Sequence, residues 1–190
     1  MRPKIICISG KAGAGKDTVG KCLAEHLNER GRVRIMHYAD LLKFICRTYL
    51  DWNGEKDEHG RRLLQVIGTN GFRVNKPDYW VDFLVSVVFY IGNNWDYVVI
   101  PDARFPNEIS RWGDFGYRVA HVRIQRNNKE NALCGECALH ESETTLDDVE
   151  PDIVFENDVD AESREFEAKI ENLAHDIDKF FVTATKKEGV

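Results

Sequence analysis

The sequence contains no apolar run of about 18 residues, the length that a helix needs to cross a bilayer. Its N-terminus also lacks the basic, apolar and small-residue regions of a secretory signal. Cysteine is scarce and odd in number, at five residues, and Cys7 and Cys22 fall in segments that read as a buried strand and the following helix. These absences argue against a membrane protein and a disulfide framework, and we expect a cytosolic protein with reduced thiols.

An excess of positive charge is also missing. Lys and Arg total 26 against 32 Asp and Glu, and the formal net charge is −6. This balance argues against broad binding to nucleic acid or to anionic membranes. Most arginines nevertheless lie in the middle of the chain, between Arg47 and Arg126. An acidic protein with a basic middle is expected to bind a small anionic ligand.

The 190 residues, 43% of them hydrophobic, are enough to bury a substantial core in one domain. Short apolar runs alternate with helix-like stretches, which is the βαβ pattern of a parallel sheet. Strands are predicted at 4–9, 33–37, 97–101, 118–124 and 152–156. Helices are predicted at 15–30, 40–50, 61–72, 79–92, 106–115 and 161–182.

Local signals support several of these helices. Asp40 and Asp78 are predicted N-caps, because a short acceptor side chain can satisfy free N–H groups at a helix start. The last helix has an apolar face that is expected to cover the sheet, formed by Phe166, Ile170, Leu173, Ile177 and Phe180. Two regions break the strict alternation, at 38–95 and 126–150. Such insertions usually carry function.

A glycine-rich segment, ISGKAGAGKDT, follows the first predicted strand and opens the first predicted helix. Its Gly-x4-Gly-Lys spacing is that of a phosphate-binding loop, in which backbone N–H groups and the helix dipole face the phosphates. Asp17 stands where Ser or Thr commonly meets Mg²⁺, so either Thr18 or water held by Asp17 could take that role. The predicted phosphate-binding residues are Gly10, Lys11, Gly13, Ala14, Gly15, Lys16, Asp17 and Thr18.

A second candidate group follows the third predicted strand, in VVIPDARFPNE. Asp102 comes just after the apolar run and faces the phosphate-binding loop, so its carboxylate could hold Mg²⁺ or its waters. Arg104, two residues later, points the same way in an extended chain. We predict both as site residues. The alternative is an Asp that caps the next helix beside a surface Arg.

The segment NKPD at 75–78 matches the guanine-reading motif of GTPases. That motif leaves the end of an apolar strand, whereas here it follows TNGFRV and precedes a predicted helix. We interpret it as a helix entry with Asp78 as the cap. The signatures Gly-x-Ser-x-Gly and His-Glu-x-x-His do not occur.

A zinc-like spacing occurs in CGECALHE. Cys134, Cys137 and His140 could supply three of the four tetrahedral ligands of Zn²⁺. No second cysteine pair follows, so the fourth ligand would have to be an acid such as Glu136 or Glu141, or water. We expect two reduced cysteines and no tightly bound zinc.

The chain resembles the phage-type deoxynucleoside monophosphate kinases in a series of segments that occur in the same order. They are GKAGAGKDT, RRLLQVIGTNGFR with DYWV, VVIPDARFPNE, HESE at 140–143 and DIVFEND at 152–158. The resemblance implies a P-loop nucleoside monophosphate kinase fold, with a five-stranded parallel sheet in the order 2-3-1-4-5, a monophosphate-binding helical insertion at 38–95 and a lid at 126–150. It implies transfer of the γ-phosphoryl group of ATP to a deoxynucleoside monophosphate, assisted by Mg²⁺, and it suggests a homodimer.

The resemblance also assigns roles by position. It places Lys16 and Arg126 on the donor phosphates, Arg62 and Arg104 on the acceptor phosphate, and Trp80 at the acceptor base or its pocket wall. We add Asp40, Asp102 and Glu108 to the predicted acceptor site. The predicted catalytic residues are Lys16, Asp102, Arg104 and Arg126, and the predicted metal site comprises Asp17, Thr18 and Asp102.

Two other functions stay open. One is another small-molecule kinase of the same fold, such as a dephospho-coenzyme A or phosphomevalonate kinase, which the segment RRLLQVIGTNGFR and the following DYW oppose. The other is a nucleotide-binding regulator without transferase activity. Phosphoryl transfer fits the basic middle of the chain, because two anionic substrates must be held in line with their charge offset.

Overall fold

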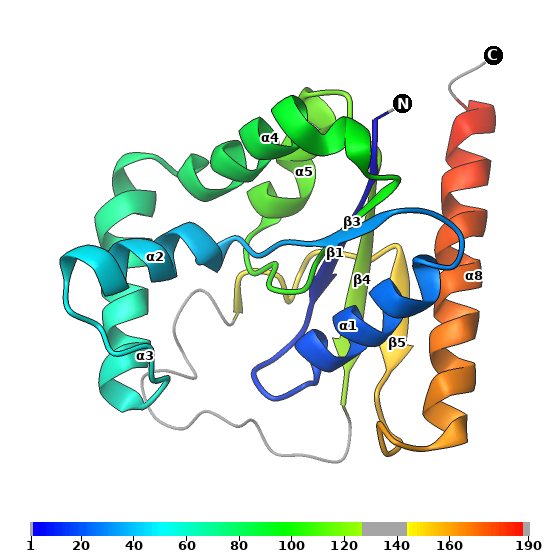
Figure 1. Ribbon diagram of the computed structural model, residues 1–190, viewed down its shortest axis with the longest axis horizontal. Coiled ribbons are helices and arrows are strands. Elements are labelled where there is room, and N and C mark those ends of the chain that lie inside the picture. Colours follow the sequence, from blue (N-terminus) through cyan, green and yellow to red (C-terminus); the bar gives the residue numbers. More distant parts are fainter. Residues whose placement is uncertain (1, 127–143, 188–190) are drawn as a thin grey trace.

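The computed structural model describes residues 2–126 and 144–187, and it contains a parallel sheet of five strands (Figure 1). The strands are β1 (Lys4–Ser9), β2 (Val33–Ile35), β3 (Tyr97–Ile100), β4 (Val119–Gln125) and β5 (Ile153–Glu156). Their order is β2-β3-β1-β4-β5, and each neighbouring pair is parallel. The predicted strands, sheet order and fold class are confirmed.

Helices cover both faces of this sheet. They are α1 (Lys16–Leu27), α2 (Ala39–Tyr49), α3 (Glu58–Gln65), the π-helix η1 (Val66–Arg73), α4 (Tyr79–Ile91), the 3₁₀-helix η2 (Gly92–Asn94), α5 (Pro106–Asp114) and α8 (Arg164–Lys187). Figure 1 shows α1 and α8 on one face and α4 and α5 on the other, while α2 and α3 extend beyond the sheet. These extending helices lie within the insertion that was predicted between the second and third strands.

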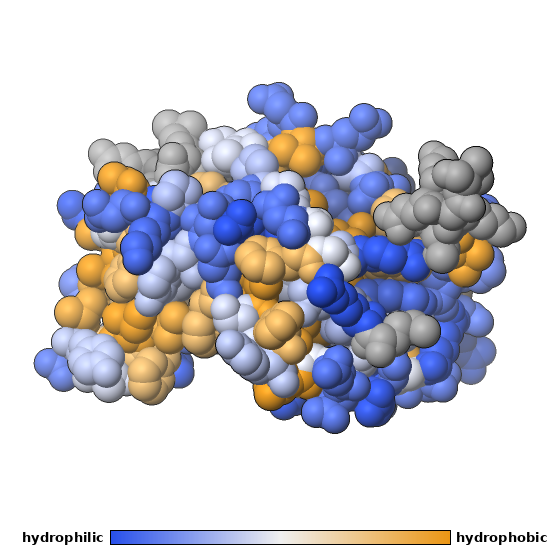
Figure 2. Space-filling view, turned by 90° about the horizontal axis from the view of Figure 1, so that it is seen from above, coloured by the Kyte–Doolittle hydropathy of each residue, from blue (hydrophilic) through white to orange (hydrophobic). Residues whose placement is uncertain are grey.

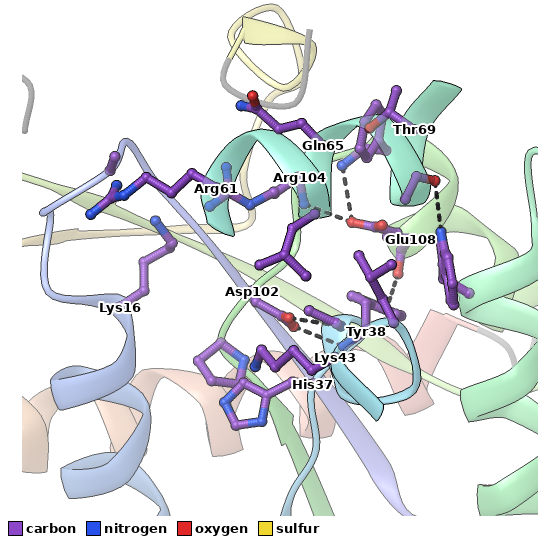
Figure 3. A pocket seen from close by; sticks show the side chains of 18 of the residues that line it. Lys16, His37, Tyr38, Lys43, Arg61, Gln65, Thr69, Asp102, Arg104 and Glu108 are labelled. Atoms are coloured by element: carbon purple, nitrogen blue, oxygen red, sulfur yellow. Dashed lines mark hydrogen bonds between the residues drawn. The ribbon is translucent and has the colours of Figure 1, made fainter. Parts of the chain in front are cut away.

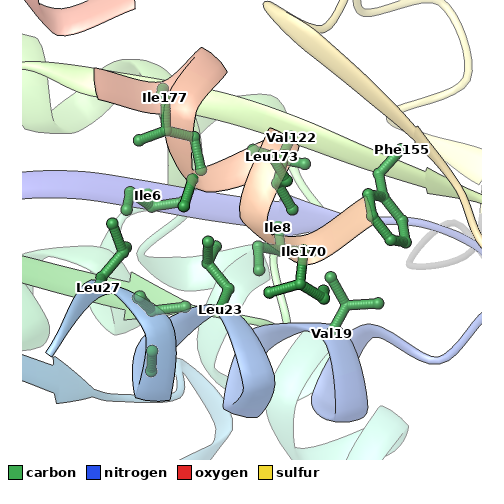
Figure 4. Packing of buried hydrophobic residues seen from close by; sticks show 14 of the residues in the cluster. Ile6, Ile8, Val19, Leu23, Leu27, Val122, Phe155, Ile170, Leu173 and Ile177 are labelled. Atoms are coloured by element: carbon green, nitrogen blue, oxygen red, sulfur yellow. The ribbon is translucent and has the colours of Figure 1, made fainter. Parts of the chain in front are cut away.

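The core has one layer on each face of the sheet. Ile6 and Ile8 of β1 pack against Leu23 of α1 and Ile177 of α8, and all four are fully buried (Figure 4). Alternate β1 residues enter the other layer, so the strand is apolar along its whole length, as expected for a parallel sheet covered on both faces. The predicted apolar face of the last helix is confirmed except at its end, where Phe181 is buried more deeply than Phe180.

The predicted single helix at 61–72 is wrong in detail, because α3 gives way to the π-helix at Val66. Glycine is a poor helix former, and the π-helix contains Gly68 and Gly71. A Cβ on Gly68 would lie 2.7 Å from Leu42 of α2. Glycine therefore lets this irregular turn pack closely on α2. π-helical turns occur frequently at functional sites.

The two predicted N-caps differ from expectation. Asp40 lies in the first turn of α2, whose N-cap is Tyr38, and its carboxylate accepts a hydrogen bond from the N–H of His37 at 3.2 Å. Asp78 is the N-cap residue of α4, but its side chain makes no capping hydrogen bond. It accepts instead from the Asn107 side chain at 2.7 Å. The Asp40 cap is therefore wrong, and the Asp78 cap is right only in position.

The interpretation of NKPD as a helix entry agrees with the structure, since no strand lies between β2 and β3 in the described chain. No helix among the described residues is both long and apolar enough to cross a membrane. Figure 2 shows hydrophobic surface gathered where the helices of the insertion lie, on the left of the molecule. The large exposed hydrophobic residues of α2 and α4 are Phe44, Tyr49, Phe83, Phe89, Tyr90 and Ile91.

Candidate active site

The loop between β1 and α1 has the backbone geometry of a phosphate-binding loop. Gly10, Gly13 and Gly15 have φ values of 146°, 78° and 91°, which residues with a side chain rarely adopt. A Cβ on Gly15 would also lie 2.4 Å from the amide nitrogen of Asn157. Because α1 begins at Lys16, the loop presents the free N–H groups of a helix N-terminus to the cavity beside it.

The Lys16 side chain folds back over this loop. Its ammonium donates to the carbonyl oxygens of Gly10 at 2.6 Å and Lys11 at 2.9 Å. Burial and, to a smaller extent, the positive charge of Arg104 lower the pKa of Lys16 to about 8. A phosphate near this ammonium would oppose both effects, because an anionic neighbour favours the charged form.

Two long-range contacts hold the loop against the far half of the sheet. The buried Asn157, just after β5, donates from Nδ2 to the carbonyl of Ala14 at 2.7 Å. Lys11 pairs with Asp147 at 2.5 Å, in the described segment that leads into β5. The loop is thereby fixed by residues more than 130 positions later in the chain.

A cavity of about 410 Å³ lies beside this loop. Its walls come from the loop, the start of α2, the α3–η1 ridge and the segment after β3 (Figure 3). Cationic side chains outnumber acidic ones in its lining. The cations are Lys16, Lys43, Lys56, Arg61, Arg73 and Arg104, and the acids are Asp17, Asp102 and Glu108. Such a cavity favours an anionic ligand next to the phosphate-binding loop.

Asp102 connects β3 to the insertion. Its two carboxylate oxygens accept hydrogen bonds from the N–H groups of Tyr38 at 3.0 Å and Ala39 at 3.1 Å. The carboxylate therefore caps α2 from a distant part of the chain, which the sequence did not predict. Burial raises the pKa of Asp102, while His37 and these backbone N–H groups lower it.

Glu108 fixes the backbone of the segment that carries Arg104. One carboxylate oxygen accepts from the N–H groups of Arg104 at 2.7 Å and Phe105 at 3.1 Å, at the start of α5. The other accepts a hydrogen bond from Arg73 of η1, whose guanidinium lies 3.7 Å from the centre of the Phe105 ring. Burial raises the pKa of Glu108 to about 7, and the Arg73 charge opposes this shift. Glu108 lines the cavity as predicted, but its oxygens are already engaged.

The predicted residues separate into two groups. Those that line the cavity are Gly13, Lys16, Asp17, Trp80, Asp102, Arg104 and Glu108. Those outside its lining are Gly10, Lys11, Ala14, Gly15, Thr18, Asp40, Arg62 and Arg126. Gly10, Ala14 and Gly15 still shape the loop, and Asp40 pairs with Lys43 at 3.6 Å. Cys134, Glu136, Cys137, His140 and Glu141 lie outside the described residues.

The predicted acceptor residue Arg62 lies outside the cavity lining. Arg61 lines the cavity and Arg62 does not, because adjacent residues on an α-helix point about 100° apart. A spacing of four residues in the sequence could have indicated Arg61 instead of Arg62. The side chains at this spacing all line the cavity, namely Arg61, Gln65, Thr69 and Arg73. Sequence reasoning also missed Lys43, Lys56 and His37, which stand in no motif that could have singled them out. It assigned no role to Asn157, although this residue lies in the DIVFEND segment at 152–158.

Solved structures share the fold. A shikimate kinase from Bacteroides thetaiotaomicron superposes with a TM-score of 0.50 and 15% identity, covering 90% of this chain and 96% of its own. The protein APE1195 superposes with a TM-score of 0.50 and 15% identity, covering 94% of this chain and 96% of its own. At such low identity the likeness concerns the fold alone.

Sequence comparison is more specific. The chain is 35% identical over 116 residues to a deoxynucleotide monophosphate kinase of Escherichia phage RB69, which covers 60% of this chain. The chain spans only 43% of the length of that relative. A family model described as deoxynucleotide monophosphate kinase matches residues 31–170, well over half of the sequence. The chain therefore belongs to the deoxynucleotide monophosphate kinase family.

Proposed function

We propose that the protein transfers the γ-phosphoryl group of ATP to a deoxynucleoside monophosphate. One observation carries the proposal, namely that a phosphate-binding loop and a second group of cations share one cavity. The loop would hold the donor, while Arg61 from α3 and Arg104 from the segment after β3 would hold the acceptor phosphate. Membership of the family supports this choice of acceptor.

Phosphoryl transfer needs no covalent bond between the substrate and the protein, which acts by positioning and charge stabilisation. An oxygen of the acceptor phosphate attacks the γ-phosphorus, the bond from that phosphorus to the β–γ bridging oxygen breaks, and ADP leaves with the electron pair. The N–H groups of the loop and the Lys16 ammonium would stabilise charge on the donor phosphates. Arg61 and Arg104 would neutralise the acceptor phosphate, so that two anions can approach in line.

Magnesium is expected at the start of α1. The exposed carboxylate of Asp17 lines the cavity, and Mg²⁺ usually takes one or two carboxylates together with phosphates and water. Asp17 therefore fits the ion. Both carboxylate oxygens of Asp102 already accept hydrogen bonds from N–H groups at the start of α2, and Thr18 lies outside the cavity lining. A bound Mg²⁺ would offset negative charge on the donor phosphates. We assign Asp102 to the placement of α2.

The remaining predictions extend this proposal. The region 38–95 would serve as the monophosphate-binding insertion in a single kinase domain, and 126–150, described only in part, as its lid. Arg126 follows β4 directly. Its assignment to the donor phosphates stays a prediction. So do the homodimer, the cytosolic location and the absence of nucleic-acid and membrane partners.

A coupled assay of ADP release across a panel of acceptors tests the function. The panel contains the four deoxynucleoside monophosphates, dephospho-coenzyme A and phosphomevalonate. We expect turnover with at least one deoxynucleotide and none with the other two acceptors. Turnover restricted to either of those two would overturn the proposal, and ATP binding without any turnover would favour a regulator.

The pH dependence of ATP use follows from the pKa of Lys16. That pKa is lowered to about 8, and only the protonated ammonium attracts phosphate. Because kcat/KM reports groups of the free enzyme, kcat/KM for ATP should fall about tenfold per pH unit above pH 8. Bound phosphates favour the charged form, so the fall in kcat should come at higher pH. A kcat/KM that stays level to about pH 9.5 contradicts this assignment.

The hydrogen bond from Asn157 to the loop predicts a selective defect. Asn157→Leu keeps the size of the side chain but removes the donor that holds the Ala14 carbonyl. Losing this hydrogen bond, with a contribution of about 1 kcal/mol to the binding of ATP, should raise KM for ATP roughly fivefold while KM for the acceptor stays unchanged. Asn94→Leu, at an exposed position on η2, is the control. Equal increases in both KM values would show that Asn157 supports the whole fold instead of the donor site.

A further inference from the structure

The α3–η1 ridge carries a row of side chains along the cavity. Arg61, Gln65, Thr69 and Arg73 all line it, and Figure 3 shows Arg61, Gln65 and Thr69 following one another along the ridge. The α-helical rise of about 1.5 Å per residue sets an upper limit of about 12 Å on the separation of Arg61 and Thr69 along the helix axis, because the π-helical part rises less. This separation is of the order of the length of a nucleoside monophosphate.

One end of the row is suited to a phosphate. Arg61 shares the cavity lining with Lys16 and Arg104, and the charge of Arg104 contributes to lowering the Lys16 pKa, after burial. These cations are therefore within electrostatic reach of one another, beside the phosphate-binding loop. A nucleotide whose phosphate lies here would place its base toward Thr69.

The charged groups at the base end are already engaged with one another. Arg73 donates to Glu108, to the Pro77 carbonyl at 3.1 Å and to Asn107 Oδ1 at 3.2 Å. The indole N–H of Trp80 donates to the Gly68 carbonyl at 3.1 Å. None of these groups can turn to a base without breaking a buried contact.

Two neutral polar side chains of the row are different. Thr69 is only 7% exposed, and Gln65 is half-buried. Within residues 2–126 and 144–187 neither side chain makes a hydrogen bond to the protein. The polar atoms of Gln65 and Thr69 are not among the buried side-chain atoms that lack a partner. They are therefore open to the cavity, where a ligand can reach them. Both line the cavity, whose apolar lining includes Leu64, Trp80 and Phe105.

We infer that Gln65 and Thr69 are the specificity-determining residues that hydrogen-bond the nucleobase of the acceptor. A carboxamide and a hydroxyl each offer both a donor and an acceptor. Since no protein contact fixes the Gln65 amide, it can present either its oxygen or its nitrogen to a base edge. The site is then complementary both to keto and to amino bases. This inference rests on the proposed function.

Gln65→Glu tests the base contact, because a carboxylate only accepts hydrogen bonds. Guanine is the base that offers two adjacent donors, N1–H and the 2-amino group. We expect the variant to raise the ratio of kcat/KM for dGMP to kcat/KM for dTMP about tenfold, while KM for ATP stays unchanged. An unchanged ratio among dAMP, dCMP, dGMP and dTMP would refute the role of Gln65.

A pair of variants tests the hydroxyl of Thr69. Thr69→Val keeps the shape without the hydroxyl, and Thr69→Ser keeps the hydroxyl. We expect Thr69→Val to lower kcat/KM about tenfold for the acceptors that the wild-type protein uses. Thr69→Ser should retain most of the wild-type kcat/KM. Thr183→Val, at an exposed position on α8, is the matched control. Equal losses of kcat/KM in Thr69→Val and Thr69→Ser, or an increase of KM for ATP in Thr69→Val, would show a packing role and overturn the inference.

The outcome also separates this inference from the function on which it rests. Wild-type protein that phosphorylates none of the four deoxynucleotides would overturn the proposed function, and the inference with it. Active wild type whose base preference is the same in Gln65→Glu, and whose Thr69→Val variant is unimpaired, would overturn the inference alone.

Discussion

Lys16→Ala is expected to reduce kcat by about 100-fold or more while the fold persists. The ammonium of Lys16 is the only cation of the described cavity lining that comes from the phosphate-binding loop, and in a bound complex it would follow the phosphoryl group as charge builds up. Its present partners are carbonyl oxygens of Gly10 and Lys11, which water can satisfy after truncation. The loss should therefore appear in turnover and not in stability.

Steady-state kinetics with saturating ATP and acceptor measures this effect. Lys21→Ala is the matched control, because Lys21 lies on the same helix with its side chain 72% exposed. Its i,i+4 pair with Glu25, at 3.9 Å, is worth only a few tenths of a kcal/mol. Near-normal turnover in Lys16→Ala would refute the assignment of the loop to the donor phosphates. Thermal unfolding of both variants shows that each remains folded.

The sheet was predictable because its signals are local. Each strand is a short apolar run bounded by helix-like sequence, and β1 is followed by a glycine spacing that only a phosphate-binding loop requires. The apolar period of α8 likewise fixed which face would be buried, with an error only at its end, where Phe181 rather than Phe180 enters the core. Such features depend on neighbours a few residues away.

The parts that sequence reasoning missed depend on distant residues. Asp102 caps α2 through Tyr38 and Ala39, which lie more than 60 residues earlier. Asn157 reaches the phosphate-binding loop across the sheet, 143 residues from Ala14. Neither contact leaves a periodic or spaced pattern in the sequence. The sequence therefore did not predict the contact of Asp102 with α2, and it gave Asn157 no role although DIVFEND contains it.

The helical ridge is an intermediate case. The resemblance to known kinases pointed to the arginine pair in RRL but selected Arg62, whereas the step of four along the ridge selects Arg61. A π-helix within that ridge was not predictable, since glycines in a helical pattern indicate a weak helix without indicating its type. The close approach of Gly68 to Leu42 explains why glycine stands there.

The second large effect is expected when an arginine that would hold the acceptor phosphate is replaced. Arg104→Ala and Arg61→Ala should each raise KM for the acceptor by about 10- to 100-fold, because a hydrogen bond to a charged group contributes about 1.5–3 kcal/mol. Arg61 comes from α3 and Arg104 from the segment after β3, and both side chains line the cavity beside the phosphate-binding loop (Figure 3). Because the lost contact would belong to one substrate, KM for ATP should change far less.

Arg62→Ala is the matched control for this experiment. Arg62 is adjacent to Arg61 in α3 and has the same charge, and both residues are exposed. Only Arg61 lines the cavity. A general electrostatic attraction of the acceptor would weaken by similar amounts in both variants, whereas a direct contact would be lost only in Arg61→Ala. Glu108 holds the Arg104 backbone, so thermal unfolding must show that Arg104→Ala keeps its stability. Equal increases of KM for ATP and for the acceptor, or an Arg62→Ala defect as large as that of Arg61→Ala, would refute the assignment of Arg61 and Arg104 to the acceptor phosphate.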